Sequence, residues 1–235
     1  MSDWFWLILL AIAIPLIVFV GWWLLIASEG VYLGRRVVIW LYDLFAPRYD
    51  GIKGFRQEYD HRFLAQPMMK RLAPETAPLI LDVATGTGRF PLAMSRHPKF
   101  RGRVIGVDLS RPMLRYGQPK FGVIQNRYAR VNLMQANAER LPFPDACFDA
   151  VTCLEALEFM IHQQVVLAEM LRVLKPGGVL LITNRINTRW MPRKTYTTEQ
   201  YVDLLFSVGV DDISVEKWQV DYDRVWGIKQ SEPNA

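Results

Sequence analysis

The stretch LDVATGTGRF, residues 81–90, decides the fold of this 235-residue chain. A continuous apolar run, LILDVA (79–84), leads into Gly86 and Gly88, and RFPLAMSRH follows with the pattern of a helix. Where a strand passes through a glycine turn directly into a helix, the first N–H groups of the helix can hold a carboxylate or a phosphate. The stretch therefore predicts a strand–turn–helix unit with a ligand at its turn.

The pattern of a strand followed by a helix repeats along the chain, and the second predicted strand also ends in an acid. RVIGVD (103–108) is a predicted strand, and the helix after it has Ser110 as its N-cap and Pro112 in its first turn. The remaining predicted elements are the strands VNLMQA (131–136), CFDAVTCL (147–154) and GVLLIT (178–183), and the helix VVLAEMLRVL (165–174), closed by Pro176-Gly177-Gly178. This alternation predicts an α/β fold with a largely parallel sheet, helices on both faces, and a ligand at the carboxyl ends of the strands.

Asp82 and Asp108 stand at the ends of the first two predicted strands. An acid that closes the second strand can accept hydrogen bonds from both hydroxyls of a ribose. The fingerprint of dinucleotide-binding proteins requires a third glycine at position 91, where this chain has Pro91. The pattern therefore favours a ribose-containing ligand and argues against NAD or FAD.

Four segments in order, LDVATGTGRF, VIGVDLSRPML, NAERLPFPDACFD and LRVLKPGGVLLIT, resemble the successive motifs of class I S-adenosylmethionine-dependent methyltransferases. They are most similar to those of the ubiquinone/menaquinone-biosynthesis C-methyltransferase group. The segment YDLFAPRYD (42–50) resembles the N-terminal motif of that group. The resemblance implies S-adenosyl-L-methionine as cofactor. It also implies a Rossmann-like sheet of seven strands with an antiparallel last strand, for which WQVDYDRVWGIKQ (218–230) would form the final hairpin.

The resemblance carries over to individual residues of this chain. It implies that Asp108 binds the ribose and that the glycine turn faces the methionine moiety. The implied cofactor-binding residues are Asp82, Ala84, Gly86, Thr87, Gly88, Asp108, Leu109 beside the adenine, Asn137 and Ala138 at the adenine edge, and Leu154 near the sulfonium.

Two departures from the family pattern bear on the acceptor. Ala84 replaces the first glycine of the usual D-x-G-x-G-x-G pattern, a change found within this group. EALEF (155–159) stands where quinone methyltransferases are expected to carry Phe-Gly-Leu-Arg-Asn. The acceptor therefore stays open between a quinone-type ring and another hydrophobic molecule such as a phospholipid amine.

The chemistry of methyl transfer explains why the sequence contains no evident catalytic triad. A sulfonium is already a good leaving group, so the protein mainly aligns the reactants and excludes water. A base is needed only if the acceptor must lose a proton. The candidates are Glu155, Glu158 and His162, with ordinary surface charge as the alternative; Tyr42 and Tyr49 are candidate substrate contacts or core aromatics.

The N-terminal segment from Trp4 to Ser28 contains no charged residue and predicts a transmembrane helix over 4–28. As a helix it is about 37 Å long, more than the ~30 Å hydrocarbon core of a bilayer. A cleaved signal peptide is disfavoured because residues 1–3 carry no basic charge and the apolar run is too long. The basic residues that follow, Arg35, Arg36 and Arg48, place the C-terminal catalytic domain in the cytoplasm.

A connector over 29–78 links this segment to a methyltransferase domain over 79–235. Helical spacing puts Val37, Trp40, Leu41 and Leu44 on one face, which either covers the core or lies against anionic headgroups. The segment RINTRWMPRK (185–194) carries four basic residues and is either a solvated surface or a lid that rests on lipid and admits the acceptor; its candidate residues are Arg189, Trp190 and Arg193.

Composition narrows the remaining function classes. The 51% hydrophobic content excludes a disordered chain, and the two cysteines and three scattered histidines predict no metal site. The net charge of +5 alone does not indicate nucleic acid, because no recognition motif accompanies it. The sequence thus predicts a membrane-anchored methyltransferase for a lipid-like small molecule, of open oligomeric state. The alternative is a catalytically silent cofactor-binding scaffold of a membrane complex.

Overall fold

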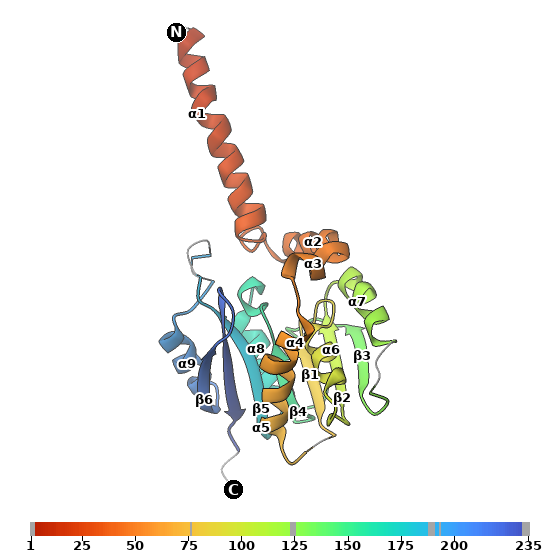
Figure 1. Ribbon diagram of the computed structural model, residues 1–235. Coiled ribbons are helices and arrows are strands. Elements are labelled where there is room, and N and C mark those ends of the chain that lie inside the picture. The colour runs from red at the N-terminus through yellow and green to blue at the C-terminus, as the bar shows by residue number, and fades with distance from the viewer. Residues whose placement is uncertain (1–2, 76, 123–125, 188–190, 193, 232–235) are drawn as a thin grey trace.

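The computed structural model describes residues 3–75, 77–122, 126–187, 191–192 and 194–231. Within these ranges the chain forms one seven-stranded sheet flanked by helices, with a long N-terminal helix that projects away from it (Figure 1). The strands are β1 (Leu79–Val83), β2 (Arg103–Asp108), β3 (Arg130–Gln135), β4 (Phe148–Cys153), β5 (Leu174–Arg185), β6 (Val210–Lys217) and β7 (Tyr222–Lys229).

The strand order is β3-β2-β1-β4-β5-β7-β6. The first five strands are parallel, whereas β7 lies antiparallel between β5 and β6. β1 pairs with β2 on one side and with β4 on the other, so the chain reverses its winding direction at β1. In open α/β sheets the crevice at such a switch point, beyond the carboxyl ends of the strands, is where ligands bind.

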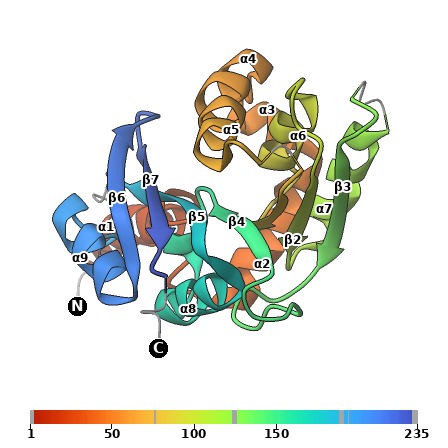
Figure 2. The same ribbon diagram turned by 90° about the horizontal axis from the view of Figure 1, so that it is seen from below.

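Alternation along the strands produces two cores, one on each face of the sheet. On β1, Leu81 and Val83 pack toward α8 (Gln163–Val173) and α9 (Thr198–Ser207). Ile80 packs toward α5 (Gln66–Leu72) and α6 (Arg89–Arg96) on the opposite face. The view from below shows these two helical layers on either side of the strands (Figure 2). Both faces are covered because successive side chains of a strand point in opposite directions.

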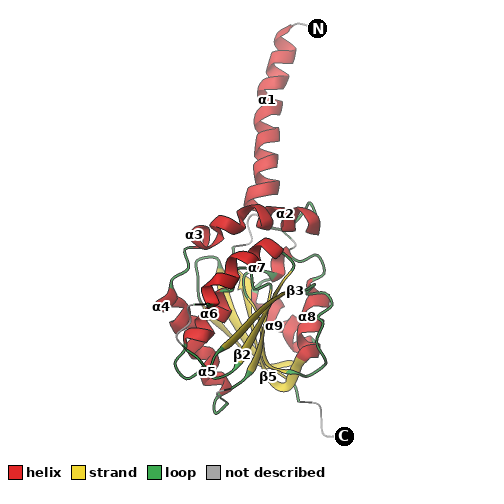
Figure 3. Cartoon of the chain, turned by 90° about the vertical axis from the view of Figure 1, so that its right-hand side faces the viewer, coloured by secondary structure: helices red, strands yellow, loops and turns green. Residues whose placement is uncertain are grey.

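The other helical elements precede the first strand along the chain or connect the strands. They are α1 (Asp3–Trp22), η1 (Trp23–Ala27), α2 (Arg35–Phe45), η2 (Ala46–Arg48), α3 (Tyr49–Lys53), α4 (Gln57–Asp60), η3 (His61–Ala65), α7 (Arg111–Gly117), η4 (Gln118–Phe121) and η5 (Leu157–Phe159). Figure 3 shows α2 and α3 lying crosswise at the foot of α1, above the sheet.

The predicted α/β sheet with seven strands and an antiparallel last strand is confirmed, with two local corrections. β5 begins at Leu174 and not at Gly178, because Leu174 already pairs with Phe148 and the register to β4 then shifts. The final hairpin is made by β6 and β7, so residues 218–221 are its turn and not its first strand.

The N-terminal segment forms a helix from Trp4 to Ala27 that is long and apolar enough to cross a membrane. Its side chains are exposed along most of its length, and it contributes none of the residues in the cores of the domain. Glu29 and Gly30 both adopt left-handed backbone conformations, with φ of 49° and 75°. At this sharp turn the chain changes direction, so that α2 lies crosswise under the end of the helix (Figures 1 and 3).

Candidate functional site

The turn between β1 and α6 is shaped by three left-handed residues. Ala84, Gly86 and Gly88 have φ of 54°, 55° and 84°. The φ of Gly88 favours glycine, and a Cβ there would also lie 2.7 Å from the ring of Phe121, which would have to shift. The conformation turns the N–H of Gly86 toward Asp108.

Asp108 ends β2 and holds the glycine turn in place. Its Oδ2 accepts a hydrogen bond of 2.8 Å from the N–H of Gly86, and its Oδ1 accepts one of 2.8 Å from the N–H of Ser110. Burial raises the pKa of Asp108, while these backbone N–H groups oppose that shift. A carboxylate has about four lone-pair sites, so each oxygen can accept a further hydrogen bond from a ligand hydroxyl.

Asp82 lies on β1 just before the glycine turn and links β1 to its surroundings. It is buried, and its two oxygens accept hydrogen bonds from the hydroxyls of Thr85 and Thr152 at 2.6 Å and 2.5 Å. Burial raises the pKa of Asp82 to about 7. These contacts tie β1 to β4 and set the start of the glycine turn.

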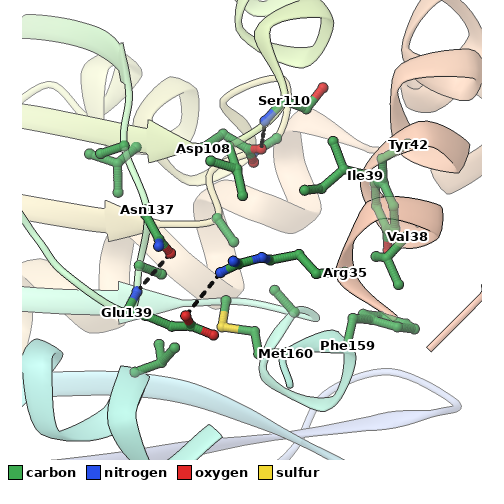
Figure 4. Close-up of a pocket in the computed structure, with 18 of the residues that line it drawn as sticks. Arg35, Val38, Ile39, Tyr42, Asp108, Ser110, Asn137, Glu139, Phe159 and Met160 are labelled. Carbon is green, nitrogen blue, oxygen red and sulfur yellow. Dashed lines mark hydrogen bonds and ion pairs between the residues drawn. The ribbon is translucent and has the colours of Figure 1, made fainter. Parts of the chain in front are cut away.

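A cavity opens directly above this strand edge (Figure 4). It encloses about 910 Å³ when the open space at its mouth is included. Its inner wall holds Asp108 beside apolar groups, and its outer wall is α2. The lining residues are Arg35, Val38, Ile39, Tyr42, Tyr49, Ala84, Gly86, Val107, Asp108, Leu109, Ser110, Ala136, Asn137, Ala138, Glu139, Leu154, Glu155, Ala156, Phe159, Met160, Ile161 and Val166.

We use the term roof for α2, η2 and α3 (Arg35–Lys53), which cover this cavity. Polar contacts join the roof to the domain at several points. Arg35 pairs with Glu139 at 2.9 Å across the mouth, and Ser110 donates from its hydroxyl to Asp43. Thr87 donates to Asp50 from the glycine turn. The roof is therefore attached to both sides of the cavity.

A second, smaller cavity lies on the far side of Tyr49, which lines both. It is bounded by Phe55, Asp82, Ala84, Thr85, Thr87, Arg89, Phe90, Leu154 and Glu155. Opposite charges meet at its edge: Arg89 pairs with Glu155 and with Asp60, both at 2.7 Å, and Lys53 pairs with Glu155 at 3.0 Å. Although burial alone would raise it, Lys53 and Arg89 hold the pKa of Glu155 below its usual value. The second cavity thus presents fixed positive and negative groups side by side.

Comparisons with known proteins agree with this geometry. Residues 81–182 match the model of a family described as a methyltransferase domain. The chain is 34% identical over 150 residues to the ubiquinone/menaquinone biosynthesis C-methyltransferase UbiE of Marinomonas sp. (strain MWYL1), an alignment that covers 63% of this chain and 58% of the relative. It is 37% identical over 142 residues to the demethylmenaquinone methyltransferase of Lactiplantibacillus plantarum, covering 60% of this chain and 59% of that protein. The chain therefore spans less than two thirds of the length of these curated relatives.

Solved structures show the same fold at lower identity. A SAM-dependent methyltransferase from Aquifex aeolicus superposes with a TM-score of 0.62 at 18% identity, covering 80% of this chain and 98% of the other. The [4+2]-cyclase SpnF superposes with a TM-score of 0.67 at 19% identity, covering 82% and 95%.

Residues 81–182 thus match a methyltransferase domain, and the sheet that carries them has the fold of a solved SAM-dependent methyltransferase. The matched family and the seven-stranded sheet indicate S-adenosylmethionine as the cofactor. The cofactor-binding residues implied by the sequence stay a prediction. Seven of them line the larger of the two cavities described above: Ala84, Gly86, Asp108, Leu109, Asn137, Ala138 and Leu154. Asp82 and Thr87 line the smaller cavity, while Gly88 lies behind the turn against Phe121.

The three candidate bases are placed differently from one another. Glu155 lines both of the cavities described above, but Lys53 and Arg89 occupy its oxygens. Glu158 does not reach the cavity, because η5 turns its side chain inward to accept a hydrogen bond from Tyr222, and burial raises its pKa to about 7. Of the two glutamates, only Glu155 therefore lines the cavity, and a role as base stays a prediction.

His162 also lies outside the cavity lining of the methyltransferase domain. It precedes α8, is exposed, and its Nδ1 contacts Glu139 at 3.1 Å on the outer rim. Tyr42 and Tyr49 both line the larger cavity from the roof. The predicted lid residues Arg189, Trp190 and Arg193 lie outside the described residues.

Sequence reasoning missed the residues that the roof and the helix after the turn contribute to the methyltransferase domain. Arg89 follows the glycine turn directly and could have been singled out by that position. Lys53 and Arg35 carry no such signal, because their partners Glu155 and Glu139 lie about a hundred residues further along the chain.

Proposed function

We propose that this chain is a membrane-anchored S-adenosylmethionine-dependent methyltransferase that acts on a hydrophobic, lipid-like acceptor, a quinone-type ring or a phospholipid amine. The observation that carries the proposal is a single cavity that joins an acidic strand end to an apolar wall beneath the N-terminal helix. The N-terminal helix would anchor the protein. By the positive-inside rule Arg35, Arg36 and Arg48 would keep the catalytic domain in the cytoplasm.

The residues of the larger cavity fit the adenosine part of the cofactor. Asp108 is held rigidly with acceptor capacity left on both oxygens, which suits a ribose diol. Leu109 and Ala138 offer apolar surface beside it, and Asn137 offers an amide at the edge where an adenine would lie.

The smaller cavity fits the amino-acid part of the cofactor. That part carries one ammonium and one carboxylate group, and the cavity edge holds Arg89 and Lys53 next to Glu155. Complementary charges in such a low-dielectric site favour binding of a zwitterion. Tyr49, at the junction of the two cavities, would then lie close to the methyl donor.

The apolar wall of the larger cavity fits a hydrophobic acceptor. Val38 and Ile39 of the roof lie across the cavity from Phe159 and Met160 of the segment after β4 (Figure 4). Ile161 of the same segment also lines the cavity. Relatives named for ubiquinone and menaquinone biosynthesis support an acceptor of this kind. A tethered enzyme meets a bilayer-borne acceptor at a raised effective concentration.

The protein's own contribution to the reaction would be alignment and exclusion of water. When bound, S-adenosylmethionine supplies a methyl group on a good leaving group. The walls of the cavity would hold the acceptor atom in line, which is the main source of rate in such a transfer. Glu155 is committed to ion pairs, so the geometry favours an acceptor that needs no strong base.

The test is transfer of a radiolabelled methyl group from S-adenosylmethionine to total lipid extract by the full-length protein in vesicles. The proposal expects label in one lipid-soluble product, whose mass identifies the acceptor. Saturable cofactor binding without transfer to any extract would instead favour a silent scaffold. The fold alone does not decide between them, because the cyclase SpnF shares it.

A further inference from the structure

The roof helix α2 has two faces with different chemistry. At about 100° per residue, Arg35, Val38, Ile39 and Tyr42 lie on one side of the helix, and all four line the cavity. Arg36, Trp40 and Leu44, spaced four residues apart, lie within an arc of about 80° on the opposite side. We call these three residues the outer stripe.

The outer stripe is exposed and apolar at its centre. Trp40 is 57% exposed and Leu44 is 59% exposed, although both are large hydrophobic side chains. The predicted apolar face is therefore split, since Val37 and Leu41 pack against Gly30 in the turn after the N-terminal helix. An exposed Trp and Leu on a basic helix are typical of a helix that lies in a membrane interface.

The acidic and basic side chains of residues 29–53 also lie on different sides of the roof. Their three acids all point to the protein: Glu29 accepts from Tyr42, Asp43 accepts from Ser110, and Asp50 pairs with Thr87 and Lys120. Arg36 and Arg48 are exposed, and within the described part of the chain neither side chain has an ion-pair partner. The outward side of the roof is thus basic, which suits anionic phospholipid headgroups.

The position of α2 fits a bilayer surface better than a protein partner. α2 begins eight residues after the end of the apolar helix and lies crosswise at its foot (Figures 1 and 3). Trp23 stacks on Tyr32 with ring centroids 5.1 Å apart, and the hydroxyl of Tyr32 donates to the carbonyl of Pro192, so the foot of the helix is tied to the domain. If the apolar helix crosses a bilayer, the outer stripe must lie at the level of its headgroups.

We propose that the outer stripe of α2 rests in the interface of an anionic bilayer while its inner face closes the cavity. The proposal rests on the membrane anchoring of the proposed function and adds the surface through which the bilayer contacts the enzyme. The mouth of the cavity, marked by Arg35 and Ile161, would then lie beside the lipid surface. A hydrophobic acceptor could pass along Val38 and Ile39 without crossing water.

The test places an environment-sensitive fluorophore on single cysteines in the full-length protein in vesicles. The background is C147S/C153A, and the labelled positions are Leu44→Cys in the stripe, Ile17→Cys in the anchor and Phe206→Cys as control. Phe206 is 64% exposed and lies at the end of α9, next to the strand end that points away from the roof. We expect quenching by nitroxide-labelled lipids at positions 44 and 17, about twofold or more above that at position 206.

The vesicle composition and the protein density separate the possible outcomes. Quenching at 44 should rise when phosphatidylglycerol is added to phosphatidylcholine, and R36Q should remove that rise. Quenching at 17 but not at 44 overturns this inference and leaves the anchor standing, whereas quenching at neither overturns both. A signal at 44 that follows protein density instead of lipid composition would show contact between copies and also overturn it.

A second measurement uses the unmodified chain, so that the inference does not depend on the folding of the cysteine variants. Hydrogen exchange of amides 35–48 should slow in vesicles containing phosphatidylglycerol relative to phosphatidylcholine alone, while amides of α9 should not change. Equal exchange of 35–48 in both vesicles would contradict the inference.

Discussion

The strand edge that carries the glycine turn and the roof above it are built in different ways. At the strand edge the contacts are local or between adjacent strands: Gly86 and Ser110 donate to Asp108, and Thr85 donates to Asp82. In the roof the contacts join distant segments, as in Lys53 to Glu155 and Arg35 to Glu139, 102 and 104 residues apart. The strand edge is therefore fixed by backbone geometry, whereas the roof depends on a few side-chain pairs and on what lies above it.

The largest effect is expected at the strand edge from Asp108→Ala. Removing both carboxylate oxygens frees the glycine turn and deletes the acceptor that we propose for the ribose, each a charge-assisted contact. We expect cofactor affinity to fall by about 100-fold or more. Equilibrium dialysis with radiolabelled S-adenosylmethionine measures it, with Asp145→Ala, a surface acid, as the matched control. If D108A and the wild type bound S-adenosylmethionine with equal affinity, Asp108 would not be part of the cofactor site.

A pH effect should follow from Asp82, whose pKa lies near 7 in the folded protein because of burial. A carboxyl with a raised folded pKa stabilises the fold when protonated. That contribution is complete below the unfolded pKa, near 4, and is lost as pH rises toward 7. We expect the free energy of unfolding to fall by about 1–4 kcal/mol between pH 4 and 7, and Asp82→Asn to flatten this slope. Urea unfolding at both pH values tests it, and an unchanged slope in D82N would contradict it.

The sequence revealed the strand edge and not the roof for physical reasons. Gly86, Gly88 and Asp108 act through backbone conformation and strand ends, so their spacing along the chain already encodes their meeting. Glu158 shows the limit of such reasoning: its position after β4 was correct, yet a single turn of η5 directs it to Tyr222 and away from the cavity. The contacts of Lys53 and Arg35 depend on how a separate helix packs, which no local pattern specifies. Helical spacing did place Trp40 and Leu44 on an apolar face, but it could not separate them from Val37 and Leu41, which pack against Gly30.

Lys53→Met removes a contact between the roof and the domain, and we expect a smaller effect than that of Asp108→Ala. The pair with Glu155 is mostly buried, and Arg89 still holds that carboxylate when Lys53 is removed. We expect a loss of about 1–2 kcal/mol in unfolding free energy and a severalfold weaker affinity for the cofactor. Chemical denaturation and dialysis report the two, with the exposed Lys70→Met as control. A loss no larger than that of K70M would mean that this pair does not secure the roof.

The smallest effect is expected from Arg35→Gln at the mouth. Its pair with Glu139 is solvent-exposed, with the Arg35 side chain 46% exposed, and such pairs contribute about 0–1 kcal/mol. Thermal unfolding should therefore be nearly unchanged in R35Q. A destabilisation as large as that of K53M would show that the roof is held mainly at its outer edge and not by the buried pair of Lys53 with Glu155.

The central claim is that the cavity over Gly86 and Asp108 binds an adenosyl sulfonium cofactor. Isothermal titration of the full-length protein in detergent with S-adenosylmethionine tests it most directly. We predict saturable heat with one site per chain, and displacement by S-adenosylhomocysteine, which keeps the same ribose and amino-acid groups. No heat with either compound would contradict the account.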